Sequence, residues 1–432
     1  MTKKLMVTVA FSGLMTAGVA NAADAPLAVK INGFFDAYIQ TAQETYPKDL
    51  KVTGNNAAST AMVGRLRLIV NPVATKSGIT YGAQLRINTG DGTLSYDRAF
   101  GYVSTASLGK LSLGRAGYLG YANSIGTVYA NNGSLGGLGP NQNIMQRSLT
   151  AGGGTGAGLS GGVVRADKIA GSYIDATPGN GFNRINYETP TIAGATAGIS
   201  YTPRASFTAA TDKNKYDWSN PRAIVGKGYK DVVEVAAKYN INMSGLDMTL
   251  AGAYVAGTAA DATGSTGFDR NLRNLRSFGA SYTLKYAGVV ANIAAANAGT
   301  SYALTDGGYF AANKAAAVAP TVPRTIGFVV NLGYESGKAA GDYSVGGYYG
   351  KGQSAGAKAS MTDPSRYTTA KVTQYGIGAQ IVVIPGLVVF LTGDRYSVFS
   401  DNAKAGTANV DTSAGGWTDR VTAVTLGSTI SF

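Results

Sequence analysis

The chain has 432 residues and a formal net charge of +13, and it contains neither cysteine nor histidine. The first absence excludes a fold held by disulfides, and the second excludes mechanisms that need an imidazole base or an imidazole metal ligand. Charged residues make up only 14% and glycines number 60, against a usual charged share of about 25%. This composition is typical of either a low-complexity chain or a membrane β-barrel, and the apolar pattern distinguishes the two.

Residues 1–22 have the pattern of an export signal. Lys3 and Lys4 precede an apolar or small stretch that ends at Val19, and an A-x-A cleavage site follows at 20–22. The apolar stretch has about 15 residues, fewer than the roughly 20 that a membrane anchor needs. We therefore expect a signal peptide at 1–22 and a single domain at 23–432. Without Lys3 and Lys4, 35 Lys and Arg stand against 24 Asp and Glu, so the mature charge is about +11.

Segments of about ten residues alternate between apolar and polar positions. In 61–71, Met62 and Leu66 share one face, and Arg65 and Arg67 share the other. A period of two predicts strands, and one apolar face against one polar or small face suits a wall between lipid and a watery lumen. The same alternation recurs in 78–88, 276–287 and 324–334.

The pattern predicts sixteen strands in an all-β, transmembrane antiparallel β-barrel. Because the number is even, the first and last strands can close the barrel and leave no edge exposed to lipid. The expected strands are 27–41, 61–71, 78–88, 97–106, 110–117, 182–188, 195–202, 231–240, 246–257, 276–287, 289–298, 324–334, 342–351, 371–382, 387–398 and 418–432.

Short and long connections alternate between these strands. Outer-membrane barrels have short periplasmic turns and long outer loops, an asymmetry that a soluble β-sandwich does not need. The short connections, each containing Gly or Pro, are 72–77, 189–194, 241–245, 287–288, 335–341 and 383–386. The long and polar ones are 203–230, 258–275, 299–323, 352–370 and 399–417.

Aromatic residues cluster near the expected strand ends, among them Phe34, Tyr282, Tyr286 and Tyr348. They would suit the two interfacial girdles of a membrane barrel. The alternative is the ordinary preference of Tyr and Phe for strands of any kind.

The final strand places Val424, Leu426, Ile430 and Phe432 on one face, and Phe432 is the last residue. Here the chain resembles bacterial porins, which end in an amphipathic strand with a terminal aromatic residue that the barrel-assembly machinery reads. Ser428 departs from the apolar alternation. The resemblance implies that Phe432 is the assembly signal.

Two internal segments resemble the trimeric general porins, which have sixteen strands. One is Asn183-Arg184-Ile185-Asn186-Tyr187-Glu188-Thr189-Pro190, running on to Gly194 and Tyr201. The other runs from Arg98 to Arg115 and closes with Gly-Lys-Leu-Ser-Leu-Gly-Arg. The resemblance covers the mature chain in pattern and implies a homotrimer.

In that family, the long connection after the fifth strand folds into the barrel and narrows the pore. In enterobacterial general porins this loop carries a pair of carboxylates that face arginines of the wall. Here no Asp or Glu occurs from Ala116 up to Asp167. The resemblance implies these candidates for the constriction loop: Leu135, Leu138 and Pro140 near its tip, with Asp167 and Asp175 later.

The resemblance also implies a ladder of arginines on the wall, for which Arg65, Arg67, Arg86, Arg98 and Arg184 are the candidates. Alternation independently places the first three on the lumenal face. A midplane Arg on the lipid face would cost about 2–4 kcal/mol. The alternative is an Arg that snorkels to the membrane interface.

An arginine wall without facing acids makes the constriction positive, which favours anions, unless Asp167 or Asp175 folds in and restores the balance. The sequence therefore predicts a porin for small hydrophilic solutes and ions, without enzymatic activity. The first alternative is a substrate-selective channel for sugars or organic acids, and another is an adhesin or anchoring barrel without a pore.

The expected location is the outer membrane of a Gram-negative cell. The expected partners are outer-membrane lipid, the barrel-assembly machinery and further copies of the chain, with no cofactor, metal or nucleic acid. The connection Arg204–Lys230 has six basic and two acidic residues. It would either contact anionic lipopolysaccharide or be a solvated outer loop.

Overall fold

The computed structural model describes residues 27–45, 58–90, 93–117, 119, 183–206, 228–260, 274–301, 324–358, 367–400 and 417–432. The expected signal peptide lies outside these residues, as do Leu135, Leu138, Pro140, Asp167 and Asp175 of the expected constriction loop. Among the described residues, no helix is long and apolar enough to cross a membrane.

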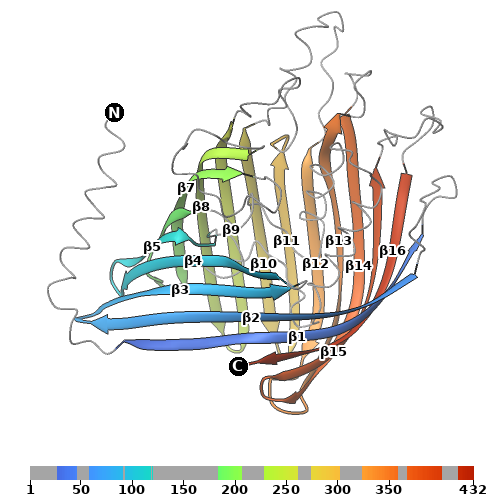
Figure 1. Ribbon diagram of the computed structural model, residues 1–432, viewed down its shortest axis with the longest axis horizontal. Helices are drawn as coiled ribbons and strands as arrows, with labels where there is room; N and C mark the ends of the chain where they lie inside the picture. Colours follow the sequence, from blue (N-terminus) through green and yellow to red (C-terminus); the bar gives the residue numbers. More distant parts are fainter. Residues whose placement is uncertain are drawn as a thin grey trace, which may run out of the picture.

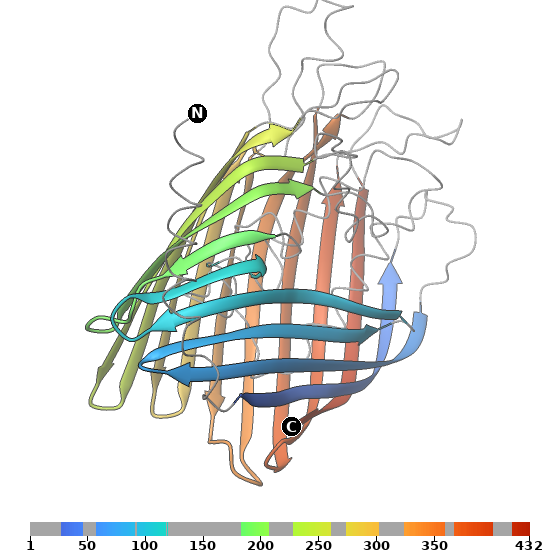
Figure 2. The ribbon, with the colours of Figure 1, turned by 60° about the vertical axis from the view of Figure 1, so that its left-hand side comes forward.

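Sixteen antiparallel strands form a closed barrel, as the sequence predicted (Figure 1). Every strand pairs with its neighbours in sequence, and β1 pairs with β16. β1–β4 run strongly inclined to β9–β14 in both views (Figure 2), as expected for opposite walls of a barrel with tilted strands. The strands are β1 (Ala28–Thr45), β2 (Ala58–Lys76), β3 (Ile79–Gly90), β4 (Thr93–Thr105), β5 (Gly109–Arg115), β6 (Arg184–Glu188), β7 (Ala195–Ser206), β8 (Gly228–Met243), β9 (Leu246–Ala260), β10 (Leu275–Tyr286), β11 (Val289–Gly299), β12 (Thr325–Glu335), β13 (Tyr343–Lys358), β14 (Tyr367–Ile384), β15 (Leu387–Ser400) and β16 (Trp417–Ser431).

Several strands are longer than the alternation predicted. β2 continues through Pro72, where the sequence predicted a turn. Proline has no backbone N–H to donate, so it is tolerated only where the ladder is interrupted. The ladder with β3 does skip this position, passing from Val70 opposite Leu85 to Val73 opposite Gly82.

Four of the short turns have a common backbone geometry. In the turn after β2, Ser77 and Gly78 have φ values of 50° and 79°. Positive φ at both central residues belongs to the type I′ turn, whose twist matches that of a hairpin. Glycine adopts this conformation without a steric penalty. The same Xaa-Gly pairing of positive φ values occurs at Ala193-Gly194, Ser244-Gly245 and Ala287-Gly288.

The described side chains reverse the arrangement of a soluble protein, because apolar residues are exposed and polar residues are buried. On the outer face, Ile377 is 75% exposed and Ile293 lies opposite Val330. On the inner face, Asn292 lies opposite Asn331, and the side-chain amide of Asn331 donates to Oδ1 of Asn292 at 3.2 Å. An apolar exterior around a polar interior is the arrangement of a barrel in lipid.

The seam between the first and last strands closes through the chain terminus. The N–H of Gly33 donates to the carbonyl oxygen of Phe432 at 2.9 Å, and the N–H of Phe432 donates to the carbonyl oxygen of Gly33 at 3.1 Å. A β-carbon at Gly33 would lie 2.1 Å from the carbonyl oxygen of Arg67, so only glycine fits at this close approach. Phe432 itself is exposed, in line with the outward residues Leu426 and Ile430 of β16.

Candidate functional site

The five predicted arginines lie on the inner face of one continuous wall, β2–β6. Register places Arg65 opposite Asp36, Arg86 opposite Arg98 and Gly114 opposite Arg184. Their neighbours in each strand at odd offsets, such as Leu66, Leu85 and Tyr187, occupy the outer face. The tilt and pairing of five adjacent strands therefore gather these side chains on one side of the lumen.

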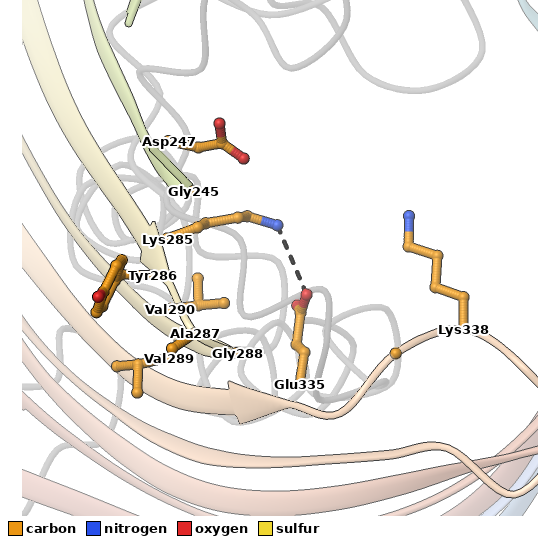
Figure 3. Close-up of a pocket in the computed structure, with 11 residues that line it drawn as sticks. Gly245, Asp247, Lys285, Tyr286, Ala287, Gly288, Val289, Val290, Glu335 and Lys338 are labelled. Atoms are coloured by element: carbon orange, nitrogen blue, oxygen red, sulfur yellow. Dashed lines mark ion pairs between the residues drawn. The ribbon is translucent and has the colours of Figure 1, made fainter. Parts of the chain in front are cut away.

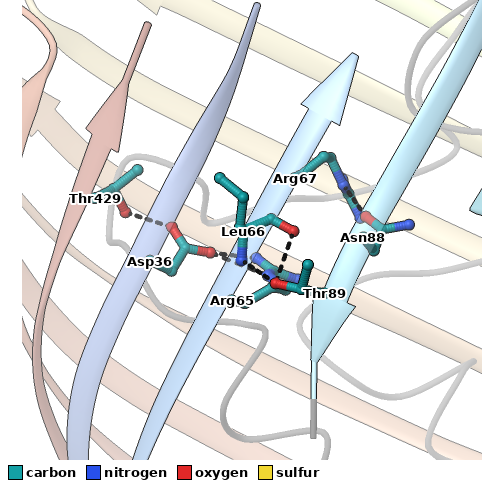
Figure 4. A network of polar contacts seen from close by, with 7 residues as sticks. All are labelled: Asp36, Arg65, Leu66, Arg67, Asn88, Thr89 and Thr429. Carbon is teal, nitrogen blue, oxygen red and sulfur yellow. Dashed lines mark hydrogen bonds and ion pairs between the residues drawn. The ribbon is translucent and has the colours of Figure 1, made fainter. Parts of the chain in front are cut away.

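Arg65 is held by a carboxylate that sequence reasoning missed. Its Nη2 lies 2.5 Å from Oδ2 of Asp36, and its Nε donates to the same oxygen at 3.1 Å (Figure 4). The Thr429 hydroxyl donates to the other carboxylate oxygen at 2.8 Å, so β1, β2 and β16 share one network. Asp36 is the acidic residue on the polar face of the strand predicted at 27–41, and that parity was the available signal.

Arg67 has different contacts from its neighbour. Its Nε donates to Oδ1 of Asn88 at 2.6 Å. The ring of Phe34 lies beneath both guanidinium groups, 5.0 Å from Cζ of Arg65 and 5.1 Å from Cζ of Arg67. This geometry is a double cation–π contact. Phe34, expected in an interfacial girdle, thus belongs to the inner face with the arginines.

Arg86, Arg98 and Arg184 are buried within the barrel, with 5%, 8% and 1% of their surface exposed. A β-carbon placed on Gly117 would lie 3.1 Å from Nη2 of Arg98, so the chain leaving β5 passes directly beside this guanidinium. Arg115 differs from them, because it shares the outward parity of Leu113 and its guanidinium lies 5.0 Å from the ring centre of Tyr96.

The long connection after β5 turns into the barrel at its first residues. The side-chain amide of Asn186 donates to the carbonyl oxygen of Gly117 at 2.9 Å. The N–H of Leu119 donates to Oε2 of Glu234 on β8 at 2.8 Å, and both residues are fully buried. Because β6 and β7 separate β5 from β8, this contact requires the chain to leave the wall and enter the lumen.

Two buried carboxylates lie on the inner wall on either side of the arginine-bearing strands. Glu234 and Asp394 are buried on the inner faces of β8 and β15. The Tyr348 hydroxyl donates to Oδ1 of Asp394 at 2.5 Å, and the Gln374 amide donates to that hydroxyl at 2.6 Å. The prediction of a positive constriction considered only the acids of the loop and did not include these two residues of the wall.

A shallow pocket of about 220 Å³ lies beside the turns that follow β8, β10 and β12. Lys285 and Glu335 form an ion pair across it at 3.6 Å, with Asp247 nearby (Figure 3). A second pair joins Lys110 to Glu188 at 3.4 Å, and the Lys110 ammonium also lies near the rings of Phe100 and Tyr102. Both pairs lie on the inner face towards the short-turn end of the barrel.

The described residues contain no cluster of acidic side chains suited to hold a metal ion. Their chemistry is that of a wall carrying fixed charge. The cations of β2–β6 lie beside aromatic rings and beside Asp36 and Glu188, while β8–β15 carry Glu234, Asp394 and the Lys285–Glu335 pair. An ion crossing such a lumen passes fixed charges of both signs.

Comparison with known proteins gives one family and several solved structures. A family model described as Gram-negative porin matches residues 7–322. Two similar structures are variants of Rhodopseudomonas blastica porin. One is 17% identical in sequence with a TM-score of 0.49, and the other is 18% identical with a TM-score of 0.47. Each match covers 94% of this chain and 100% of the porin chain. OmpT of Vibrio cholerae, lacking its loop L8, is 10% identical with a TM-score of 0.47 over the same shares. No curated protein matches the chain.

Proposed function

This chain belongs to the Gram-negative porin family, and from that premise we propose that it forms a water-filled channel through the outer membrane for passive diffusion of small hydrophilic solutes and ions. The observation that carries the proposal is the closed barrel with an apolar, exposed outer face and a polar, charged inner face. Proteins of this family are channels rather than enzymes.

Planar-bilayer recording tests the channel directly. Purified protein should insert in discrete conductance steps that scale with salt concentration, as expected for a watery pore. A folded barrel that inserts without conductance would refute the proposal and would favour an anchoring barrel.

A preference for anions is the finer part of the proposal. The inner faces of β2–β6 carry six described basic side chains, Arg65, Arg67, Arg86, Arg98, Lys110 and Arg184. Among the described residues of β1–β6, Asp36 and Glu188 partly offset them. The remaining positive excess on this wall attracts anions, and the zero-current potential across a salt gradient measures the preference.

A second candidate is a channel selective for organic acids. Phe34 lies beneath two guanidinium groups, and Phe100 and Tyr102 lie beside the ammonium of Lys110. Aromatic faces next to cations can hold a planar anion. Liposome swelling separates the two candidates: a general pore gives rates that fall smoothly with solute size, and a selective pore gives a saturable excess for one class.

Assembly as a homotrimer is supported by the outer face of β4. Ala99 and Gly101 point outward there, and Gly101 is exposed. Small residues allow another protein surface to approach closely within a membrane. Native mass spectrometry that finds only monomer in mild detergent would contradict the trimer.

Phe432 is proposed as the signal that the barrel-assembly machinery recognises. It is exposed on the outer side and lies at the seam where β1 meets β16. Replacing Phe432 with Ser should lower the yield of folded barrel in the outer membrane while leaving export intact, which fractionation with a heat-modifiability gel measures.

A further inference from the structure

A lysine and a glutamate lie beside two aromatic rings on the inner wall formed by β4, β5 and β6. Lys110 on β5 lies opposite Glu188 on β6, and its ammonium is 3.4 Å from Oε1 of Glu188. The same ammonium is 5.9 Å from the ring centre of Phe100 and 5.5 Å from that of Tyr102. We call these four residues the lower wall site, because they lie towards the short-turn ends of their strands.

The two rings present an aromatic surface to the lumen. Their centres are 6.4 Å apart and their planes are inclined by 50°. The ring of Tyr102 lies close against the wall at Gly82, where a β-carbon would come within 2.9 Å of its Cζ. Both rings are partly exposed on the inner face, so the ring of a solute can pack on them.

The ion pair has hydrogen-bonding capacity to spare. Charge-assisted hydrogen bonds are usually about 2.7–2.9 Å long, so the contact between Lys110 and Glu188 at 3.4 Å is loose. Within the described part of the chain, the Lys110 ammonium donates one hydrogen bond, which Glu188 accepts through Oε1. The side chain of Lys110 is 36% exposed and that of Glu188 is 16% exposed. Further N–H donors of the ammonium and Oε2 of the carboxylate are therefore open to a solute.

The surrounding charges give the lower wall site a direction. Arg98 is the next lumenal residue after Phe100 towards the long connections, and Arg184 lies at the same end of β6, four residues from Glu188. Positive charge therefore lies on the long-connection side of the site, and the carboxylate lies on its short-turn side. A solute with two opposite charges is oriented with its negative end towards Lys110 and the arginines.

We propose that the lower wall site binds aromatic α-amino acids. The α-carboxylate accepts hydrogen bonds from the Lys110 ammonium, the α-ammonium donates to Oε2 of Glu188, and the side-chain ring packs on Phe100 and Tyr102. An ion pair has no net charge with which to attract a simple anion, whereas it complements both charges of a zwitterion. The rings favour an aromatic solute, because aromatic pairs attract each other beyond the area that they bury. The proposal rests on the channel proposed above, which admits the amino acid to this wall.

Saturation-transfer NMR on the purified barrel in detergent measures binding without requiring conductance. L-Phenylalanine should bind at least about threefold more tightly than each of three analogues that lack one group, since an aromatic pair or an exposed charge contact supplies that much. The analogues are 3-phenylpropionate without the ammonium, phenethylamine without the carboxylate, and L-leucine without the ring. Equal binding of phenylalanine and any one of them would overturn the proposal.

The variant Lys110→Gln/Glu188→Gln removes one charge of each sign and leaves the net charge of the lumen unchanged. It should bind phenylalanine between about fivefold and about 25-fold more weakly. The matched control is Lys285→Gln/Glu335→Gln, which removes an ion pair at the same end of the inner face. Within the described part of the chain, no aromatic ring makes a cation–π contact with Lys285. The control should bind as the wild type does, and equal losses in both variants would overturn the proposal.

A ring variant tests the site with both charges in place. Phe100→Leu should remove most of the preference for phenylalanine over leucine while leaving the barrel folded, because leucine fills the position without offering an aromatic face. A folded Phe100→Leu barrel that keeps the full preference would overturn the ring contact. This variant also decides the question if the loss of the ion pair prevents folding, which a heat-modifiability gel detects.

Current recording in planar bilayers distinguishes this site from the channel itself. Phenylalanine should reduce the open-channel current of the wild type in a saturable manner, and it should do so at a concentration at least about fivefold higher for Lys110→Gln/Glu188→Gln. A barrel that binds phenylalanine without conducting would refute the channel and uphold the site. A conducting barrel that does not bind phenylalanine would overturn the site alone.

Discussion

Replacing Arg65 and Arg67 together with alanine should shift the ion selectivity of the pore towards cations. Arg65 is paired with Asp36, so its removal exposes a bare carboxylate on the wall. Arg67 is bonded to the neutral side chain of Asn88, so its removal deletes a positive charge. Each substitution lowers the local charge by one unit, so the double variant lowers it by two units.

The expected size follows from Coulomb's law. A unit charge about 8 Å from a passing ion contributes about 0.5 kcal/mol in water, and screening at 0.1 M salt leaves about 0.2 kcal/mol. Removal of two charges therefore changes the energy of an anion by about 0.4 kcal/mol and that of a cation by the opposite amount. The ratio of anion to cation permeability should fall roughly fourfold.

The assay is the zero-current potential across a tenfold KCl gradient in planar bilayers. Asp36→Asn should move the potential in the opposite direction from the double variant, because it removes a negative charge from the same network. Arg276→Gln/Arg324→Gln also removes two positive charges, both outside the lumen, and should leave the potential unchanged.

An Arg65/Arg67 double variant with unaltered selectivity, or with the same selectivity as Arg276→Gln/Arg324→Gln, would refute the assignment of Arg65 and Arg67 to the ion path. A cation-selective wild type would refute the anion preference itself. That result would shift attention to the buried carboxylates of the inner wall outside β2–β6, including Asp394.

Three other outcomes are expected. Gly33→Ala should destabilise the barrel by about 1–3 kcal/mol in urea unfolding, because its β-carbon would collide with a backbone carbonyl, whereas Gly393→Ala, with open space around it, should unfold like the wild type. Glu234→Gln should preserve the folded barrel but increase open-channel current noise, since the charged acceptor that holds Leu119 is lost; an unchanged noise spectrum would count against this anchor. N-terminal sequencing of the outer-membrane protein should begin at Ala23, and retention of Met1 would contradict the signal peptide.

The fold could be predicted from the sequence because two independent patterns agreed. The alternation of residues such as Met62 and Arg65 predicted strands, and the alternating lengths of the connections predicted a barrel in a membrane. Strand ends were harder to predict, since β2 continues through Pro72 where the ladder happens to be interrupted. Alternation reports which face a residue occupies, but it does not report where pairing stops.

The charged wall was predicted only in part, because alternation gives the face of a residue but not its partner. The parity of a strand places Arg65 on the polar face, but the identity of its partner depends on the register between β1 and β2. The contact of Leu119 with Glu234 joins the connection after β5 to β8, and no local pattern encodes it. Glu234 lies between Val233 and Val235 in a strand that also contains Asp231 and Lys238, and the sequence gives no hint of its partner.

The seam between β1 and β16 makes the last step of barrel formation unlike the others. Fifteen of the sixteen strand pairings join neighbours in the sequence, whereas the Thr429–Asp36 bond joins residues 393 positions apart. Closing so long a loop costs about 3 kcal/mol more chain entropy than closing a ten-residue hairpin. Until that step the chain is a curved sheet with two unpaired edges, each able to pair with another copy. Refolding yield is therefore decided at the seam, where closure within one chain competes with pairing between chains.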